Sequence, residues 1–360
     1  MPTFHVETPP APYDVVVERG ILQHAAKYVP PKAGKVFVVS TDDVWRHQCA
    51  RLENGLAAIP HEVLFLPGGE DQKRLDPIER LAEEMVRLGG DRSSVVVAFG
   101  GGIVTDMAGF LAAIFMRGVP VVQIPTTLLA QVDAAIGGKT GVNLASGKNL
   151  LGTFHQPRAV LIDPAVLETL PSREYCAGLY ESLKCGIIGD PGLFRLFEDR
   201  RREILDRDPV LVEKVIADSV LLKASVVSAD EREGGLRQVL NFGHTIGHAL
   251  EAETGYTQLL HGEAVAWGMI AATHIALSTG KLDSVTAGRI TNAVLGFGRL
   301  PRMKLQTASI LKRLRSDKKM RQGVVHFILP REIGKVEITR DVPEAIVRSA
   351  IDEIRKLARS

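Results

Sequence analysis

The first half of the chain alternates short apolar runs with amphipathic stretches. Three β-branched runs, at 35–40, 94–99 and 119–124, are continuous enough to form strands that are buried on both faces. Between the first two runs, residues 76–88 place apolar side chains three or four positions apart, the spacing of an amphipathic helix. A further run at 159–163 predicts a late strand. Strands that alternate with helices predict an α/β fold with a parallel, doubly wound sheet.

The pattern changes after Pro171, where helical periodicity replaces the strand-like runs. The helical patterns cover residues 208–229, 243–253 and 262–279. We therefore expect two domains, an N-terminal α/β domain over residues 1–170 and a mainly helical domain over residues 171–360. A length of 360 residues is comfortable for two domains of ordinary size.

The composition argues against several classes of protein. Lys and Arg number 44 against 42 Asp and Glu, so the net charge of +2 gives no support for nucleic-acid or membrane binding. The three cysteines are odd in number and lack CxxC spacing, which favours a reducing, cytoplasmic compartment. The N-terminal residues do not resemble a signal peptide, and no apolar run is long enough to cross a membrane.

A glycine-rich segment at 99–106 follows the second predicted strand and opens a helix. Glycines let the backbone approach a phosphate closely, and a helix N-terminus offers free N–H groups. The segment therefore predicts a pyrophosphate site, although Thr105 stands where the strict fingerprint has a third glycine, and a purely structural turn is equally compatible. Thr126 and Thr127 would add hydroxyl groups at the same edge of the sheet. Asp42, after the first strand, could accept from a ribose hydroxyl or cap a helix.

A second glycine-rich segment, at 133–149, also carries charged and amide side chains. Lys139 and Lys148 are suited to bind an anion, and the glycines permit close approach. The alternative is a flexible surface loop with solvated lysines. Because Asp133 and Asn149 lie in the same segment, the combination favours a binding loop.

Three histidines and an acidic residue form the candidate metal site. His244 and His248 are four residues apart, so both rings lie on one face of a helix, and His261 opens the next helical segment. A catalytic zinc typically takes three protein ligands, and Glu181 is the candidate carboxylate, with Lys184 one turn further on. Hydrogen-bonded structural imidazoles are the alternative. The spacing does not decide which of the three histidines would bind metal.

Other polar residues bear on this prediction. Arg237 and Asn241 flank the histidines, which favours a metal site over isolated structural imidazoles. Further along the chain, Lys318 and Lys319 could contact a phosphate. Spacing alone favours a solvated charge run for that pair.

Taken together, these motifs resemble those of the 3-dehydroquinate synthase family. The resemblance extends from about residue 67 to residue 319, with its segments in family order: PGGEDQK, FGGGIVTDMAGF, RGVPVVQIPTTLLAQVD, GGKTGVN, GKNLLGTF, TLPSRE, ESLK, DEREGGLR, NFGHTIGH, HGEAV and DKK. It implies a dinucleotide-binding domain joined to a helical metal-binding domain, usually in a homodimer. It also implies conversion of 3-deoxy-D-arabino-heptulosonate 7-phosphate to 3-dehydroquinate and phosphate, in the shikimate pathway, with NAD and a zinc or cobalt ion.

The resemblance also implies roles for individual residues. The metal ligands would be Glu181, His244 and His261. The substrate and its phosphate would contact Lys139, Asn149, Lys184, Lys223, Arg237, Asn241, His248, Lys318 and, from across the dimer, Arg117, with Glu233 in support. NAD would contact Asp42, Glu70, Lys73, Gly101, Gly102, Ile103, Val104, Thr105, Asp106, Thr126, Thr127, Asp133, Lys139, Lys148 and Thr169. The choice between Lys318 and Lys319 stays open.

The sequence departs from the family pattern at two places. Residues 180–185 read Tyr-Glu-Ser-Leu-Lys-Cys where Ala-Glu-Val-Ile-Lys-Tyr is commoner, and Ala134 or Ala135 stands where a serine is usual. Neither departure removes a charged group or a predicted ligand.

Three alternative functions are compatible with parts of the pattern. Another sugar-phosphate cyclase would be expected to differ at Lys223, Asn241 or His248. A metal-dependent polyol dehydrogenase of the same fold usually has Asp at the position of Glu181 and lacks the lysines of the GGKTGVN and GKN segments. A non-catalytic dinucleotide-binding module would have no need to combine lysines, arginine, amide and histidines.

Overall fold

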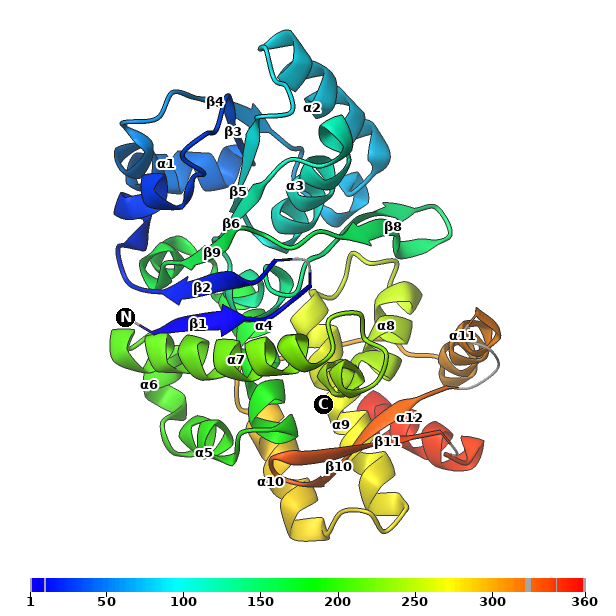
Figure 1. The fold of residues 1–360 in the computed structure, drawn as a ribbon. Helices are drawn as coiled ribbons and strands as arrows, with labels where there is room; N and C mark the ends of the chain where they lie inside the picture. Colours follow the sequence, from blue (N-terminus) through cyan, green and yellow to red (C-terminus); the bar gives the residue numbers. More distant parts are fainter. Residues whose placement is uncertain (1, 10, 321–324, 341, 359–360) are drawn as a thin grey trace. The chain divides into compact units, whose positions relative to one another are not determined.

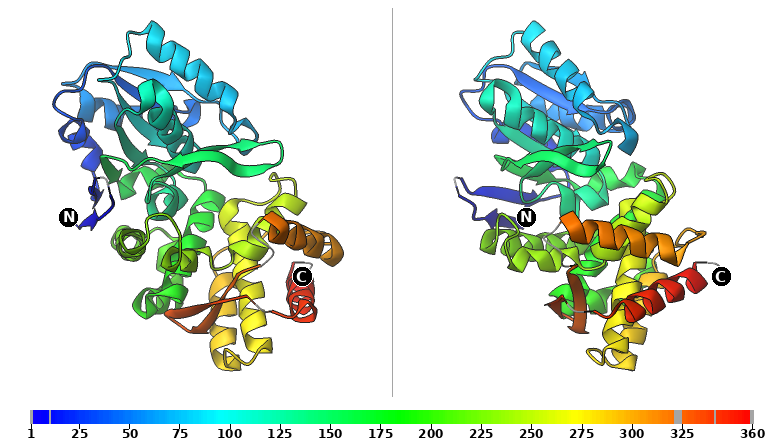
Figure 2. Two further views of the ribbon diagram at one scale, coloured as in Figure 1. Left: turned by 45° about the vertical axis from the view of Figure 1, so that its right-hand side comes forward. Right: turned by 90° about the vertical axis from the view of Figure 1, so that its right-hand side faces the viewer.

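The computed structural model describes residues 2–9, 11–320, 325–340 and 342–358, without the side chains of 316–320. The chain divides into two compact units, Met1–Pro171 with Lys223–Arg232, and Ser172–Leu222 with Glu233–Ser360. The sequence pattern assigned residues 171–360 to one domain, whereas Lys223–Arg232 belongs to the first unit. Hydrogen bonds within that unit explain this difference, since Glu231 accepts from Gln156 and Ser228 accepts from the backbone of Glu7. Figures 1 and 2 show the fold.

The first unit is built on a seven-stranded sheet. In spatial order its strands are β1 (Thr3–Val6), β2 (Tyr13–Val17), β9 (Ala159–Ile162), β6 (Val121–Pro125), β5 (Val95–Gly100), β3 (Val36–Ser40) and β4 (His61–Phe65). All neighbouring strands are parallel except β1, which is antiparallel to β2. The apolar runs of the sequence form β3, β5, β6 and β9, in which every residue is buried. The predicted parallel sheet is therefore confirmed.

Helices cover both faces of this sheet. The helical elements of the unit are η1 (Ile21–Tyr28), α1 (Asp42–Leu56), η2 (Glu70–Gln72), α2 (Leu75–Arg87), α3 (Gly102–Ile114), η3 (Phe115–Arg117), η4 (Ala130–Ala134) and η5 (Pro164–Thr169). Phe37 and Val39 of β3 share a core cluster with α2 and α3, whereas Val36 and Val38 share another with α1 and η1. Figure 1 shows α2 and α3 on one side of the strands and α1 on the other. Successive strand residues point to opposite faces, so β3 binds helices on both sides, as the doubly wound prediction requires.

The second glycine-rich segment forms a hairpin of β7 (Lys139–Leu144) and β8 (Gly147–Phe154). The prediction of a loop is therefore wrong for most of this segment. β7 lies against α3 at Gly109, where an added Cβ would be 2.6 Å from the side chain of Thr140. Glycines disfavour strands in general, so the sequence did not indicate that close packing on α3 would stabilise this one.

The second unit is mainly helical. Its elements are α4 (Ser172–Ile188), α5 (Pro191–Asp199), α6 (Arg201–Leu205), most of α7 (Pro209–Ala229), η6 (Leu236–Asn241), α8 (His244–Glu253), α9 (His261–Ser278), α10 (Ser284–Leu295), α11 (Thr307–Met320), β10 (Phe327–Glu332), β11 (Lys335–Thr339) and α12 (Glu344–Leu357). The three predicted helical patterns correspond to α7, α8 and α9. Within the described residues, none of the helices combines the length and the apolar character needed to cross a membrane.

Two glycines of α9 allow it to touch the backbones of its neighbours. A Cβ at Gly262 would lie 1.9 Å from the carbonyl oxygen of Ala177 in α4. A Cβ at Gly268 would lie 1.8 Å from the carbonyl oxygen of Gly243, which precedes α8. No side chain fits at either position without a backbone shift, so these contacts fix α4 and α8 against α9.

Candidate metal and dinucleotide sites

Glu181, His244 and His261 converge in the second unit. Glu181 lies in α4, while His244 and His261 are the first residues of α8 and α9. Their candidate ligand atoms lie within 4.8 Å of one another. Nε2 of His244 is 3.9 Å and Nε2 of His261 is 3.7 Å from Oε1 of Glu181. Two imidazoles and one carboxylate form a donor set that can bind a divalent metal and leave a position open.

The close helix contacts explain why these three residues meet. His261 precedes Gly262, which touches Ala177 one turn before Glu181. His244 follows Gly243, which touches Gly268 of α9. The backbone approach therefore brings the start of α9 to α4 and the start of α8 to α9.

Contacts at Nδ1 orient both imidazole rings. Nδ1 of His244 lies 3.1 Å from the carbonyl oxygen of Phe242, and Nδ1 of His261 lies 3.4 Å from Oε2 of Glu251. When Nδ1–H donates to these acceptors, Nε2 carries the free lone pair. Nε2 is also the atom of each ring that faces Glu181, so both rings are oriented for metal binding.

The Glu181 carboxylate is buried with incomplete compensation. Its side chain is 1% exposed, and Oε1 accepts no hydrogen bond from a described residue. Nζ of Lys184, one turn along α4, forms an ion pair with Oε2 at 2.5 Å. A buried carboxylate needs counter-charge or hydrogen bonds. Lys184 supplies positive charge at Oε2 only. A cation at Oε1, between the two histidines, would supply the counter-charge on the other side of the carboxylate.

His248, Glu251 and His261 form a second group with ligand atoms close enough for a metal. His248 is exposed and its ring centroid is 5.9 Å from that of His261. In this group the Glu251 carboxylate, which faces Nδ1 of His261, would have to bind the metal itself. The group of Glu181 and His244 uses Nε2 of His261 and leaves Glu251 to support the ring, so the geometry favours it.

Glu233, Arg237 and Asn241 lie in one short segment of the second unit. Arg237 and Asn241 are in η6, and Asn241 Nδ2 donates to Oε1 of Glu233. Glu233 has a left-handed φ of 62°, a conformation that is uncommon outside glycine and often found at functional sites. Arg237 is 2% exposed. The segment thus holds a buried guanidinium and an oriented amide.

The first glycine-rich turn joins β5 to α3 in the first unit. β5 ends at Gly100, and Gly101 is the N-cap of α3, with no side chain bonded to the helix end. A Cβ at Gly101 would lie 2.9 Å from Cγ2 of Thr127. The buried hydroxyl of Thr126 has no hydrogen-bond partner among the described residues. Uncapped N–H groups and this hydroxyl are suited to bind a phosphate.

Lys73 connects residues predicted to contact NAD with one predicted to contact substrate. Its Nζ donates to Oδ2 of Asp106 and, over 2.6 Å, to Oδ1 of Asn149. Burial raises the pKa of the Asp106 carboxyl, while the ammonium of Lys73 lowers it. Glu70 lies three residues away in η2 and pairs with Nζ of Lys148 at 3.6 Å. The backbone N–H of Lys73 donates to the carbonyl oxygen of Glu70 at 3.3 Å, so these five residues form one connected group in the first unit.

Lys223 contacts the π-helical turn η4. Its Nζ donates to the backbone oxygen of Asp133 over 2.6 Å and to the carboxylate of the same residue. Gln131 holds the turn, since its Nε2 donates to the carbonyl oxygens of Pro125 at 3.2 Å and Asp163 at 3.0 Å. Single π-helical turns are frequent at functional sites.

Other predicted residues are distributed over the first unit. Asp42 is the exposed first residue of α1, and Thr41 occupies the N-cap, which excludes the alternative that Asp42 is the N-cap and leaves its contact with a ribose as a prediction. Thr169 ends η5 and accepts a hydrogen bond from Gln48 Nε2 at 2.7 Å. Lys139 is the exposed first residue of β7.

Two predicted phosphate contacts are not tested by the geometry. Arg117 ends η3, is exposed and has a φ of 69°. Its role across a dimer stays a prediction. Lys318 and Lys319 belong to α11, but their side chains lie outside the described residues.

Sequence reasoning left three supporting residues without a role. Gln131 holds η4, Glu251 contacts a candidate ligand, and Asn143 links the hairpin to the segment at 70–73. Gln131 and Asn143 stand within motifs that were singled out, and Glu251 lies three residues after one. Their residue types are compatible with many roles, so only the contacts identify them.

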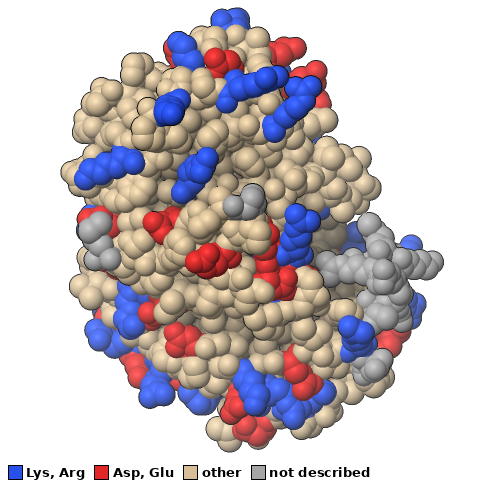
Figure 3. Space-filling model, in the orientation of Figure 1, with Lys and Arg blue, Asp and Glu red and all other residues tan. Residues whose placement is uncertain are grey.

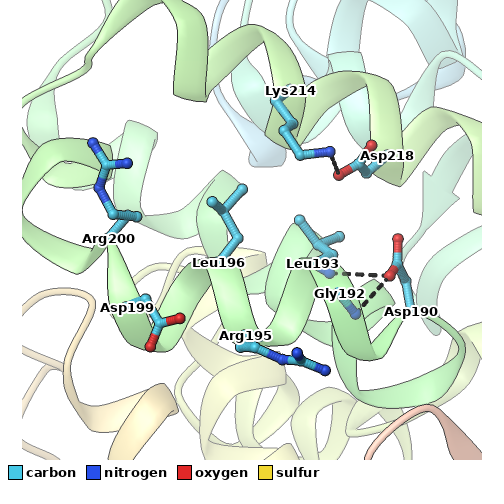
Figure 4. A pocket seen from close by; sticks show the side chains of 9 residues that line it. All are labelled: Asp190, Gly192, Leu193, Arg195, Leu196, Asp199, Arg200, Lys214 and Asp218. Atoms are coloured by element: carbon cyan, nitrogen blue, oxygen red, sulfur yellow. Dashed lines mark hydrogen bonds and ion pairs between the residues drawn. The ribbon is translucent and has the colours of Figure 1, made fainter.

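An open depression of about 550 Å³ lies elsewhere in the second unit (Figure 4). Asp190 accepts from the backbone N–H groups of Gly192 and Leu193 at 2.9 and 3.0 Å, and Lys214 pairs with Asp218 at 2.8 Å. These charged groups cap or stabilise helices, and none of the predicted site residues lines the depression. We do not assign it a function.

Charged side chains of both signs occur over the face shown in Figure 3, with wide uncharged areas between them. Among the described residues on this face, no continuous basic area resembles a nucleic-acid footprint.

The fold and the convergent acidic and histidine side chains place the chain among the sugar-phosphate cyclases. A structure of 2-epi-5-epi-valiolone synthase from Streptomyces hygroscopicus subsp. jinggangensis 5008, with NAD+ and Zn2+ bound, has 30% identity and a TM-score of 0.89, with 97% of this chain and 98% of that chain covered. A structure of 2-deoxy-scyllo-inosose synthase complexed with carbaglucose-6-phosphate, NAD+ and Co2+ has 27% identity and a TM-score of 0.89, with 99% of both chains covered.

Sequence comparisons identify the family. Models of the 3-dehydroquinate synthase N-terminal and C-terminal regions match residues 63–177 and 178–320. A 3-dehydroquinate synthase from Solibacter usitatus (strain Ellin6076) is 59% identical over 352 residues, which cover 98% of this chain and 99% of that protein. The chain belongs to the 3-dehydroquinate synthase family.

Proposed function

We propose that this protein acts as a 3-dehydroquinate synthase, a carbon–oxygen lyase that converts 3-deoxy-D-arabino-heptulosonate 7-phosphate to 3-dehydroquinate and phosphate. One observation carries the proposal beyond family membership. Nε2 of His244 and Nε2 of His261 face the same buried oxygen of Glu181, at 3.9 and 3.7 Å. A substrate with vicinal hydroxyl groups is suited to the position that three protein ligands leave open on a metal.

The proposed cofactors are NAD and a zinc or cobalt ion. Neighbours of closely similar fold were determined with NAD+ and with Zn2+ or Co2+, which supports both. When bound, NAD would accept a hydride from the C5 alcohol of the substrate and later return it, and the metal would polarise substrate hydroxyls. Glu181, His244 and His261 would hold the metal. The glycine turn at Gly101 and Gly102 would bind the pyrophosphate.

The protein's own share of the chemistry is positioning and electrostatics. In the second unit, Lys184, Arg237, Asn241 and His248 would contact the substrate, and Glu233 would orient the Asn241 amide through their hydrogen bond. In the first unit, Lys139, Asn149 and Lys223 would do so. We propose that the departing phosphate itself takes the proton from the carbon beside the new ketone. The substrate-contacting residues of both units would then hold the charged groups of the substrate in place, and no side chain would remove this proton.

The direct test supplies the heptulosonate phosphate with a divalent metal and less than stoichiometric NAD. The expected result is repeated turnover, with phosphate released, 3-dehydroquinate formed and no accumulation of NADH. Chelation should abolish the activity, and zinc or cobalt should restore it. Net NADH formation with an alcohol substrate would instead indicate a polyol dehydrogenase.

Another sugar-phosphate cyclase activity is the second candidate, because two such synthases share the fold over nearly the whole chain. Lys223, Asn241 and His248 match the dehydroquinate pattern and favour the first candidate. The two are separated by assaying a related heptulose phosphate beside the heptulosonate phosphate. Turnover of the former alone would overturn the main proposal.

We also propose a cytoplasmic homodimer in which the two compact units serve as the NAD-binding and the metal-binding domain, and which acts in the shikimate pathway. The predicted contribution of Arg117 across the dimer gives a test. Mixing an inactive His244→Ala protein with an inactive Arg117→Ala protein should restore part of the activity if Arg117 acts on the partner's site. No restoration after verified subunit exchange would contradict the prediction.

A further inference from the structure

We propose that Asn143 is a positioning residue that couples the segment at 70–73 to Asn149. This inference rests on the proposed function, in which Glu70 and Lys73 contact NAD and Asn149 contacts the substrate. Asn143 is 7% exposed. It lies in β7, where the pairing with β8 shifts register between Val142 and Leu144. Such irregularities redirect a side chain away from the regular ladder and are common beside functional sites.

Every polar group of the Asn143 amide side chain is used. Nδ2 donates to Oε1 of Glu70 at 2.8 Å and lies 3.3 Å from the Glu70 carbonyl oxygen. Oδ1 accepts from the backbone N–H of Asn149 at 2.8 Å. The backbone N–H of Asn143 donates to the carbonyl oxygen of Lys73 at 2.8 Å. One residue therefore touches both ends of the 70–73 segment and the backbone of Asn149.

The hydrogen bond between Asn143 and the backbone of Asn149 stabilises an unusual backbone conformation at Asn149. Asn149 has a left-handed φ of 53° and is exposed. Its backbone N–H is held by Asn143, and its Oδ1 accepts from Nζ of Lys73 at 2.6 Å. Lys73 also donates to Asp106, the fifth residue of α3. Asn143, Asn149 and Lys73 are thus joined in a ring of three hydrogen bonds. This ring fixes the proposed substrate contact Asn149 relative to the proposed NAD contacts.

The chemistry of this position requires both a donor and an acceptor. Aspartate would keep the acceptor for Asn149 but would place a carboxylate at hydrogen-bond distance from the Glu70 carboxylate. A like-charge contact in a half-buried site disfavours the arrangement. Replacing Glu70 by glutamine at the same time would restore a donor–acceptor pair with the direction reversed.

The test measures NAD binding by titration calorimetry without turnover, and KM and kcat for the heptulosonate phosphate separately. Asn143→Asp should raise the Kd for NAD at least tenfold and raise KM at least fivefold, with the far-ultraviolet circular dichroism unchanged. The double variant Glu70→Gln/Asn143→Asp should bind NAD at least threefold more tightly than the two single effects predict. Asn54→Asp, an exposed change on α1, is the matched control and should leave these constants unchanged.

Either of two results would overturn the inference. The first is an Asn143→Asp variant whose Kd for NAD lies within twofold of the wild-type value. The second is a double variant whose Kd for NAD equals the value expected from the two single effects combined. If Asn143→Asp does not fold, Asn143→Ala replaces it with the same thresholds for Kd and KM. Failure of the proposed function is a different outcome, because it would appear in the unchanged protein as absent turnover or absent NAD binding.

Discussion

Oε2 of Glu251 lies 3.4 Å from Nδ1 of His261, and the Glu251 side chain is 2% exposed. The two residues come from different helices, α8 and α9, whose approach is set by glycines. A carboxylate at Nδ1 selects the tautomer in which Nε2 is free, and Nε2 is the atom that faces Glu181. Glu251 is therefore placed to orient the His261 ring, with Nε2 available as a metal ligand.

We expect Glu251→Ala to weaken metal binding by about ten- to a hundredfold, the range found when the outer partner of a metal-binding histidine is removed. Glu251→Gln keeps an acceptor but loses the charge, so its effect should be smaller. Competition with a chelating dye measures both affinities. Glu253→Gln is the matched control, because Glu253 bonds Ser309 and Arg313 and should not affect the metal.

The same measurement separates the two candidate ligand groups. If Glu181 and His244 bind the metal with His261, Glu181→Gln should abolish binding and His248→Ala should leave it nearly unchanged. The opposite pattern would show that His248 and Glu251 are the ligands and would contradict metal binding by Glu181 and His244.

Gly262→Ala should damage the metal site through packing. The new Cβ would meet the carbonyl oxygen of Ala177 at 1.9 Å, so α9 must move away from α4. Overpacking of this kind costs about 1–3 kcal/mol, and a backbone contact offers little relief. Because His261 is the neighbouring residue, metal affinity should fall together with the free energy of unfolding.

Gly288→Ala is the control for this experiment. Gly288 is in α10, and nothing lies within 4 Å of a Cβ added there. Because the added Cβ has open space, alanine in place of this helical glycine should stabilise the fold by up to about 1 kcal/mol and leave the metal unaffected. Equal behaviour of the two variants in chemical denaturation and metal titration would refute the packing argument.

The sequence predicted the parallel sheet and the long helices well, because apolar runs such as 94–99 and the helical pattern at 262–279 depend on local periodicity. It also singled out Glu181, His244 and His261, which the structure brings together, although their role as ligands stays a prediction. Residue spacing alone did not choose among the three histidines, and only the resemblance to the family named His244 and His261. That choice depends on which ring nitrogen faces the carboxylate, and tertiary packing decides this.

The hairpin and the boundary between the units also depend on tertiary contacts, which local sequence patterns do not report. The segment 133–149 was predicted to be a loop because it combines several glycines with lysines, yet Gly109 of α3 provides the space in which β7 packs. Lys223–Arg232 follows the predicted boundary at Pro171 and overlaps the helical pattern at 208–229, so the sequence placed it in the helical domain, whereas it belongs to the first compact unit. Hydrogen bonds such as that of Gln156 to Glu231 join residues far apart in the chain, and no local pattern reports them.

Gly101→Val should separate the two proposed cofactors. The substitution brings Cβ to 2.9 Å from Thr127 Cγ2 and adds branches where a phosphate would approach the helix end. We expect the Kd for NAD to rise more than tenfold. The metal affinity of the second unit should stay unchanged in the same protein, which provides an internal control. Loss of both affinities would indicate general unfolding, and unchanged NAD binding would contradict the assignment of the turn.

Glu337→Gln should remove a pH-dependent part of the stability. The hydrogen bond from Lys281 lowers the pKa of the Glu337 carboxyl from its usual 4.5, with smaller help from Thr339 and Arg331 and opposition from burial. A carboxyl whose pKa is lower in the folded state stabilises the fold above the unfolded pKa, and this contribution is lost as the pH falls through the folded pKa. The Glu337 side chain is one-third exposed, so we expect the ion pair to stabilise the fold by about 0.5–1 kcal/mol at neutral pH.

Urea denaturation between pH 7 and pH 3 should show a difference in stability between Glu337→Gln and the wild-type protein that shrinks below about pH 5. Glu353→Gln, which removes an exposed pair with Lys356 on α12, should have little effect. A difference for Glu337→Gln that is constant with pH would exclude the ionised carboxylate as its cause.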